Sequence, residues 1–140
     1  MSPTRALVCG AALAALLAIT TGCGKQLYPV EGVVVFDDGS PDPKLSGGTV
    51  SLESVVNKSN ASGQIGRDGS FQIRGPSGEI GVPTGSYRVL VHPPEGADRR
   101  NPLLDPKYSR YETSGVEIAV TEGPNKVTVT VSRPSVGKKN

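Results

Sequence analysis

The chain has 140 residues and a formal net charge of +2, from 15 basic and 13 acidic side chains. This length corresponds to one domain, and the near balance of charge gives no argument for binding to nucleic acid or another polyanion. The 18 glycines and 12 prolines interrupt the chain too often for long helices. After Cys23 we therefore expect a β protein with almost no α-helix.

Residues 1–22 have the layout of a signal peptide for export. Arg5 supplies the early positive charge, and residues 6–19 form a nearly continuous apolar run. A transmembrane helix needs about 20 apolar residues. The run is shorter than that, so we expect a signal that is removed rather than a permanent span. Cleavage is expected between Gly22 and Cys23, after small residues.

The segment Thr20-Thr21-Gly22-Cys23 resembles the lipobox of bacterial lipoproteins. The resemblance implies a diacylglycerol on the Cys23 thiol and a fatty acid such as palmitate on the new amino group. The segment departs from the family pattern in one position, because Thr20 stands where leucine is usual. The alternative is an ordinary secretory signal that leaves Cys23 as a free thiol. Cys9 leaves with the signal, and a single remaining cysteine favours an anchor over a disulfide framework.

From Val30 the chain is predicted to be a succession of short strands separated by turn residues. Because Asp68-Gly69 suits a tight turn, the third and fourth strands are predicted to pair as a hairpin. The predicted strands are residues 30–36, 48–53, 63–66, 70–74, 85–92, 116–120 and 127–131.

Alternation along these strands indicates which residues face the core. Short alternating strands between turns are typical of an antiparallel sandwich of two facing sheets. We expect one domain at residues 30–133, between a tether at residues 23–29 and a flexible basic tail at residues 134–140. The expected core positions are Val30, Gly32, Val34, Phe36, Val50, Leu52, Ile65, Phe71, Ile73, Tyr87, Val89, Val91, Val116, Ile118, Val120, Val127, Val129 and Val131.

The order of these segments resembles the small lipoproteins of planctomycete-type bacteria, whose domain is described as carboxypeptidase regulatory-like or transthyretin-like. The matching segments are residues 29–36, 47–52, 61–65, 68–71, 82–89, 106–109 and 113–116. The resemblance implies an all-β fold, a single Greek-key antiparallel β-sandwich of about seven strands like transthyretin (prealbumin). It implies a structural or binding module of the cell envelope and no reaction.

The residues offer no recognisable catalytic or metal site. A catalytic zinc normally needs three protein ligands, and His92 is the only histidine. A serine nucleophile would need the same imidazole as its base. Asp37, Asp38 and Asp42 could present oxygens to calcium, but Pro41 and Pro43 restrict their loop, so solvated turn residues are expected. We expect no enzyme, no metal and no cofactor beyond the lipid on Cys23.

Residues 93–114 form the longest stretch without a strand pattern, and stretches of this length are usually functional or disordered. Basic and aromatic side chains alternate there and could bind an acidic or carbohydrate surface through charge and ring stacking. The alternative is that Leu103, Leu104 and Tyr108 close the open end of the sandwich while the charges stay in water. The candidate ligand-binding residues are Arg99, Arg100, Lys107, Tyr108, Arg110 and Tyr111.

Together these observations predict a non-enzymatic lipoprotein exposed in the periplasm or at the cell surface. Its expected partners are the membrane, through the lipid, and an envelope protein or glycan, but no nucleic acid. A glycan- or peptide-binding accessory module for a separate enzyme is the alternative, and a transthyretin-like hydrolase is the least favoured. Gly24 lacks the aspartate that retains lipoproteins at the inner membrane of enteric bacteria, so the outer membrane is preferred.

Overall fold

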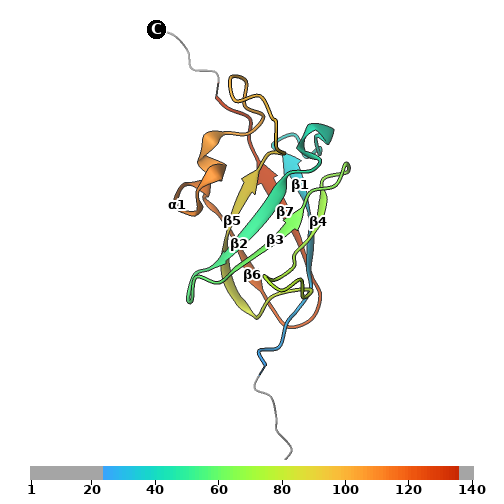
Figure 1. Ribbon diagram of the computed structural model, residues 1–140, viewed down its shortest axis with the longest axis vertical. Helices are drawn as coiled ribbons and strands as arrows, with labels where there is room; N and C mark the ends of the chain where they lie inside the picture. Colours follow the sequence, from blue (N-terminus) through green and yellow to red (C-terminus); the bar gives the residue numbers. More distant parts are fainter. Residues whose placement is uncertain (1–23, 136–140) are drawn as a thin grey trace, which may run out of the picture.

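The computed structural model describes residues 24–135, which fold into two facing β-sheets (Figure 1). The described residues contain seven strands: β1 (Val30–Phe36), β2 (Thr49–Ser54), β3 (Asn60–Gln64), β4 (Ser70–Gln72), β5 (Gly85–His92), β6 (Val116–Val120) and β7 (Asn125–Val131). Strands β4, β1 and β7 form one sheet, and β3, β2, β5 and β6 form the other. The predicted all-β sandwich is confirmed. The predicted signal peptide, the acylation at Cys23 and residues 136–140 of the predicted tail lie outside the described residues.

The helical elements of the described residues are three short turns. They are the 3₁₀ turns η1 (Pro43–Leu45) and η2 (Pro106–Ser109) and the helix α1 (Tyr111–Ser114). Both 3₁₀ turns begin with Asp-Pro-Lys, and each aspartate accepts a hydrogen bond from the lysine backbone N–H, at 2.9 Å and 3.0 Å. Proline suits the first position of such a turn, and the aspartate satisfies a free N–H at its start.

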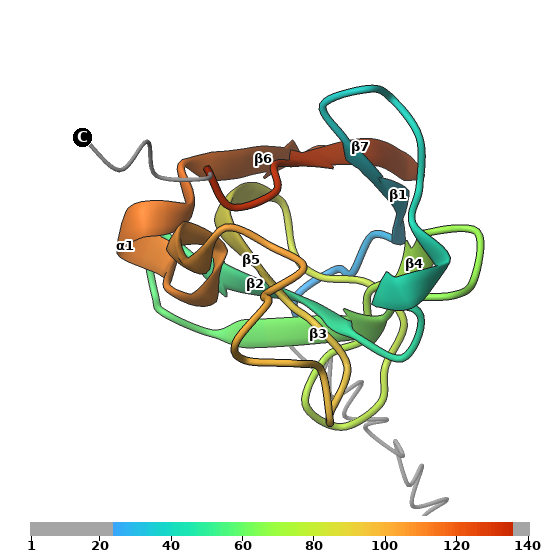
Figure 2. The ribbon, with the colours of Figure 1, turned by 90° about the horizontal axis from the view of Figure 1, so that it is seen from above.

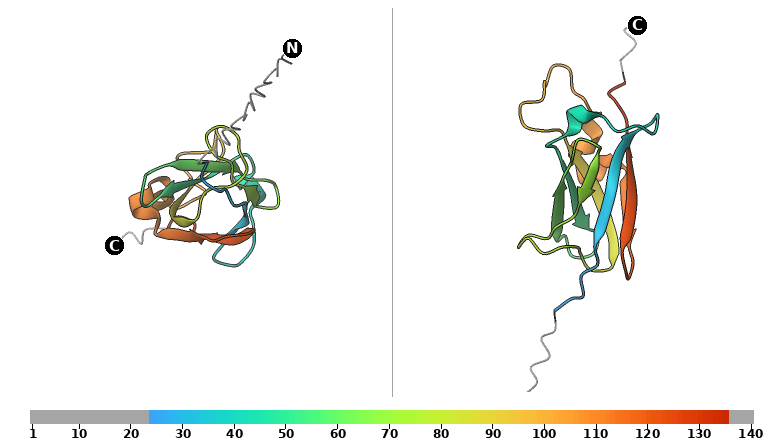
Figure 3. Two further views of the ribbon diagram at one scale, coloured as in Figure 1. Left: turned by 90° about the horizontal axis from the view of Figure 1, so that it is seen from below. Right: turned by 90° about the vertical axis from the view of Figure 1, so that its right-hand side faces the viewer.

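One strand pair differs from the predicted antiparallel arrangement. Strands β1 and β7 run parallel, in register from Val30 opposite Asn125 to Phe36 opposite Val131. Figure 3 (right) shows them side by side. The other four ladders, β1–β4, β2–β3, β2–β5 and β5–β6, are antiparallel as expected. The parallel pair arises because β6 belongs to the opposite sheet, so β7 crosses over and joins β1 at its free edge.

The predicted hairpin of residues 63–66 and 70–74 forms only in part. The Gly66 N–H donates to the Ser70 carbonyl at 2.8 Å, and Ser62 and Arg74 exchange two backbone hydrogen bonds, of 2.9 Å and 2.8 Å, in an antiparallel bridge. The Asp68-Gly69 turn forms, with the Ser70 N–H donating to Asp68 at 3.0 Å. Between these contacts the two segments part, and the ladder of β3 is with β2 while that of β4 is with β1 in the other sheet. The turn is therefore a corner that carries the chain from one sheet to the other. Both arrangements bury the same alternate residues, so the alternation did not distinguish between them.

The core lies between the two sheets and contains the expected inward residues. All of them are buried except Gly32, Val116, Ile118 and Val127, which are partly covered. Leu45 of η1 and Val82 before β5 add to it. The predicted core is therefore confirmed at nearly every strand position.

The sandwich has two distinct ends (Figure 1). One end, which we call the tether end, consists of residues 24–29, the β2–β3 turn at residues 55–59, the β4–β5 link at residues 73–84 and the β6–β7 turn at residues 121–124. The opposite end, which we call the distal end, consists of η1, residues 93–105 and residues 132–135. Because β1 and β7 run the same way, the described chain begins at the tether end and stops at the distal end (Figure 3).

Hydrogen bonds fasten the chain at the tether end. Tyr28 and Val82 exchange two backbone hydrogen bonds, of 2.8 Å and 3.1 Å. The buried Asn125 donates through Nδ2 to the carbonyls of Thr121 (2.9 Å), Gly123 (3.0 Å) and Pro29 (3.3 Å). This one amide therefore joins the β6–β7 turn to the start of β1.

Candidate functional site

The first part of residues 93–114 is a loop that projects beyond the sheets at the distal end (Figure 3, right), whereas the later part, with η2 and α1, lies along one side of the sandwich (Figure 2). Leu104 and Tyr108 are each only 5% exposed and belong to the core, and Leu103 packs against it. The Tyr108 hydroxyl accepts a hydrogen bond from the Ser132 N–H at 3.0 Å, and the Asp105 N–H donates to the Ser132 carbonyl at 3.0 Å. The alternative in which Leu103, Leu104 and Tyr108 close the sandwich is confirmed. The assignment of Tyr108 as a ligand-stacking ring is wrong, because its ring is buried.

The predicted basic residues remain in water but do not converge. Arg99, Arg100, Lys107 and Arg110 are all exposed. The Arg100 backbone N–H donates to Asp98 at 2.9 Å, and the Lys107 ammonium lies 5.0 Å from the centre of the Tyr108 ring. None of these four cations lines the cleft at the distal end.

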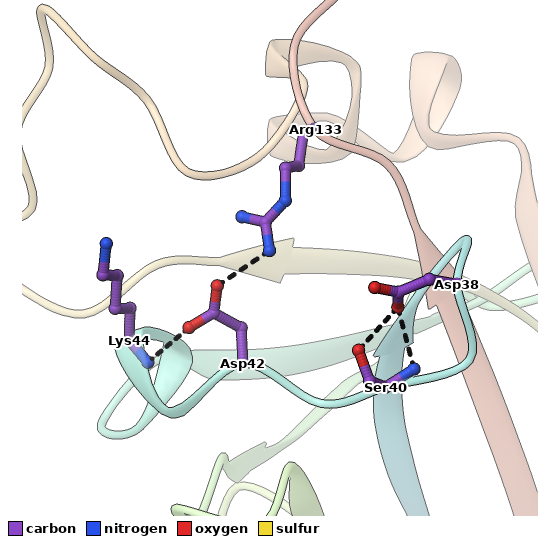
Figure 4. Close-up of polar contacts among 5 residues, drawn as sticks. All are labelled: Asp38, Ser40, Asp42, Lys44 and Arg133. Atoms are coloured by element: carbon purple, nitrogen blue, oxygen red, sulfur yellow. Dashed lines mark hydrogen bonds and ion pairs between the residues drawn. The ribbon is translucent and has the colours of Figure 1, made fainter.

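That distal cleft has a volume of about 640 Å³ and lies between residues 94–103 and residues 133–135. Lys44 and Arg133 line it together with Glu95 and Asp98, so its charge is mixed. The Arg133 guanidinium lies 2.9 Å from Asp42 Oδ2 (Figure 4). It also lies 4.1 Å from the centre of the Phe36 ring. Arg133 thereby fixes the segment after β7 to the end of β1.

The aspartates before η1 act as turn residues, as predicted. Asp38 accepts from the Ser40 N–H at 2.9 Å and from its hydroxyl at 2.6 Å, which lowers the pKa of Asp38 (Figure 4). The Lys44 N–H, followed by Arg133, lowers the pKa of Asp42 although partial burial opposes this. Within residues 24–135 no group of three or more His, Cys, Asp or Glu side chains is placed to hold a metal ion.

The remaining predicted residue, Tyr111, borders a groove of about 410 Å³ with mixed polar and apolar lining on the outer face of the four-stranded sheet. Its hydroxyl donates to Asn60 Oδ1 at 3.3 Å. Burial and the Glu53 carboxylate raise the pKa of Tyr111, and a hydrogen bond with Ser51 partly opposes them. We call this the Tyr111 groove, and its polar and aromatic lining consists of Ser51, Asn60, Ser62, Arg74 and Tyr111.

The Tyr111 groove combines chemical groups that suit a hydroxyl-rich ligand. Two hydroxyls, one amide and one guanidinium can donate and accept hydrogen bonds. The tyrosine ring forms an apolar wall beside them, with a polar tip. Sequence reasoning found Tyr111 but missed Ser51, Asn60 and Ser62, because serine and asparagine on the solvent face of a strand carry no distinctive pattern.

Comparisons with known proteins identify no family. No family model matches the chain, and no curated protein matches it. Similar solved structures include a DUF3823 family protein from Bacteroides ovatus, with a TM-score of 0.48, 14% identity, and coverage of 77% of this chain and 45% of that one. Another is a DUF3823 family protein from Parabacteroides merdae, with a TM-score of 0.48, 16% identity, and coverage of 79% and 48%. This chain spans about half the length of either structure.

The described part of the chain contains no helix with the length and hydropathy needed to cross a bilayer.

Proposed function

We propose that this protein is a non-enzymatic lipoprotein of the bacterial cell envelope. Acyl chains on Cys23 hold the sandwich at a membrane, where it binds or spaces other envelope components. The observation that carries the proposal is the short apolar run that ends in Thr21-Gly22-Cys23. Several acyl chains give stable attachment, since each buried methylene contributes about 0.8 kcal/mol and a single chain is marginal.

The position of the tether supports this proposal. Residues 24–27 separate Cys23 from Tyr28, which is fastened to the domain through Val82. An anchor at Cys23 therefore places the tether end against the membrane and the distal end, with its cleft, away from it (Figure 1). The outer membrane or its periplasmic face remains the preferred location.

The proposal assigns no reaction to the domain. A serine or cysteine nucleophile needs a positioned base, and the only histidine of the chain, His92, is exposed at the end of β5. A survey of hydrolase activity with the purified protein checks this part of the proposal, and turnover that depends on His92 would contradict it.

Mass spectrometry of the protein extracted from bacterial membranes tests the anchoring. We expect a mature chain that begins at Cys23 and carries a diacylglycerol and an amide-linked fatty acid. The matched variant Cys23→Ser should be neither acylated nor retained in the membrane fraction. Recovery of the native chain from the cytosol with residues 1–22 intact, or of an unmodified Cys23 thiol at the mature N-terminus, would overturn the proposal.

A second candidate function is glycan binding in the Tyr111 groove. The observation in its favour is that Tyr111, unlike Tyr108, lies at the surface beside Ser51, Ser62 and Asn60. An aromatic ring next to hydrogen-bonding groups suits the apolar face and the hydroxyls of a sugar.

A glycan array probed with the purified domain tests this candidate. We expect Tyr111→Ala to abolish binding and Tyr111→Phe to retain most of it, because the phenylalanine ring preserves the stacking surface. Arg99→Ala with Arg100→Ala is the matched control and should bind normally, since both residues lie outside the groove. Equal binding by Tyr111→Ala and the parent protein would exclude the groove.

A further inference from the structure

The large exposed hydrophobic side chains of the described residues lie at the tether end. They are Val56, which is 88% exposed, and Ile80, which is 48% exposed. Val56 lies in the β2–β3 turn and Ile80 in the β4–β5 link. No other large hydrophobic side chain in residues 24–135 is exposed to this degree.

The turn holds Val56 in the solvent by a set of hydrogen bonds. The Lys58 N–H donates to the Ser54 carbonyl at 3.0 Å, and the Ser54 N–H donates to the Ser59 carbonyl at 2.9 Å. The Val55 N–H donates to the Ser86 carbonyl of the neighbouring strand at 3.0 Å. Lys58 adopts a left-handed conformation, with φ of 61°, that closes the turn. The exposure of Val56 is therefore built into a hydrogen-bonded turn.

The tether lies beside both hydrophobic segments. Lys25 and Leu27 line a cleft of about 300 Å³ together with Asn57, which follows Val56, and Glu79, which precedes Ile80. A fully extended chain advances at most about 3.6 Å per residue, so Cys23 lies within about 18 Å of the fastened Tyr28. Acyl chains on Cys23 would bring this end of the domain to the lipid headgroups.

From these observations we propose that the tether end is a membrane-contacting surface, in which Val56 and Ile80 enter the headgroup region of the bilayer that holds the anchor. This inference rests on the proposed acylation of Cys23. The partner is the lipid surface itself, because the segments that expose Val56 and Ile80 flank the path of the tether.

The charges around the two side chains fit a lipid headgroup. Lys25 is exposed on the tether, and Lys58 lies two residues after Val56, with its ammonium 3.6 Å from Glu53 and its side chain 56% exposed. Both ammonium groups can approach lipid phosphates while the neighbouring apolar side chains leave water. The Glu79 carboxylate accepts a hydrogen bond from the Ser77 N–H at 2.9 Å.

Single tryptophan probes test the contact, because the chain contains no tryptophan. The full acylated protein carrying Val56→Trp or Ile80→Trp is reconstituted into phosphatidylcholine–phosphatidylglycerol vesicles. The matched control is Asn101→Trp in the exposed lining of the distal cleft. We expect the emission of the first two probes to shift to shorter wavelength and to be quenched severalfold more by lipids brominated near the headgroup than the control.

The outcomes separate this inference from the proposed function. The mass of each reconstituted protein shows whether Cys23 is acylated, and an unmodified Cys23 would defeat the anchoring on which the inference rests. If the protein is acylated and floats with the vesicles while the probes at positions 56 and 80 emit like the probe at position 101, the contact is refuted and the anchor stands. Circular dichroism of each variant confirms that the fold is retained.

Discussion

Gly32 has no side chain, and this leaves space in the core for the Phe71 ring. It lies in register with Phe71 of β4 on one side and Val127 of β7 on the other. A Cβ atom at this position would lie 2.7 Å from Phe71 Cζ and 2.8 Å from Val127 Cγ2, and it would also collide with the Val127 carbonyl oxygen. The absence of a side chain is therefore what lets the Phe71 ring and β7 approach β1.

We predict that Gly32→Ala lowers the free energy of unfolding by about 1–3 kcal/mol, because an added methyl group overpacks a filled core. Urea denaturation measures the change. Gly24→Ala is the matched control, since a Cβ atom there meets nothing within 4 Å and should leave stability unchanged. Equal stability of Gly32→Ala and the parent protein would show that β7 moves aside without cost.

Asp42 gives the domain a stabilising contribution that depends on pH. The Lys44 N–H and Arg133 lower the pKa of Asp42 in the folded state below its ordinary value of 3.8. A lowered pKa means that this contribution is fully present above pH 3.8 and is lost as the pH falls through the folded-state pKa. We expect Asp42→Asn to be less stable than the parent protein at pH 7, by about 1 kcal/mol or less for a partly exposed ion pair.

Unfolding measured from pH 7 down to pH 2 tests this linkage. The stability difference between the parent protein and Asp42→Asn should stay constant above pH 3.8 and shrink below it. Arg133→Gln should also weaken the dependence, because it removes the ion pair but leaves the Lys44 N–H in place. A difference that persists unchanged at pH 2 would contradict the assigned contacts.

At the scale of elements, residues 93–114 contain both buried side chains that stabilise the fold and exposed side chains that do not. We predict that Tyr108→Ala lowers the free energy of unfolding by about 3–5 kcal/mol, as for other large buried aromatic rings. Tyr108→Phe should cost about 1 kcal/mol, because only the hydrogen bonds to Ser132 are lost. Arg99→Ala with Arg100→Ala should stay within about 0.5 kcal/mol of the parent protein. Thermal unfolding distinguishes these outcomes, and a large loss from the arginine pair would contradict their exposure.

The sequence predicted which strand residues are buried but not how every strand pairs. Period-two alternation determines the inward face of a strand, and Ile65, Phe71 and Ile73 are buried as expected. Alternation carries no information about the neighbouring strand, so the sequence predicts a continuous hairpin around Asp68-Gly69 and not the ladder that β4 forms with β1. Gly63 gives a signal that could have helped. A Cβ atom there would collide with the Gln72 backbone, so glycine permits the crossing of β3 and β4.

The candidate site was only partly predictable for a similar reason. Tyr111 and Tyr108 lie three residues apart in one basic segment, and nothing in the sequence shows that one ring is buried and the other is at the surface. The distinction depends on η2, whose Asp-Pro-Lys start directs Tyr108 toward Ser132. The same three residues begin η1, and this repeated motif is a signal of both turns that sequence analysis could have used.

At the scale of the whole molecule, the expected sandwich and its single core were predictable because composition and alternation both favour them. The contacts that close the two ends of the sandwich were not predictable from the sequence. Asn125 and Arg133 each act through partners more than ninety residues away, Pro29 and Asp42 respectively. A single polar residue in a turn or after a last strand gives no indication of such a partner in the sequence alone.

The parallel pairing of β1 and β7 also determines how the domain would respond to mechanical load. A protein anchored at its N-terminal end and gripped at its far end is stretched along these two strands, in opposite directions. Their seven register pairs, from Val30–Asn125 to Phe36–Val131, then lie in shear and must rupture together instead of unzipping in sequence. Forced unfolding is governed by the unfolding rate. If Cys23 is acylated as proposed, the domain should therefore transmit tension between the membrane and a partner bound at its distal end before it unfolds.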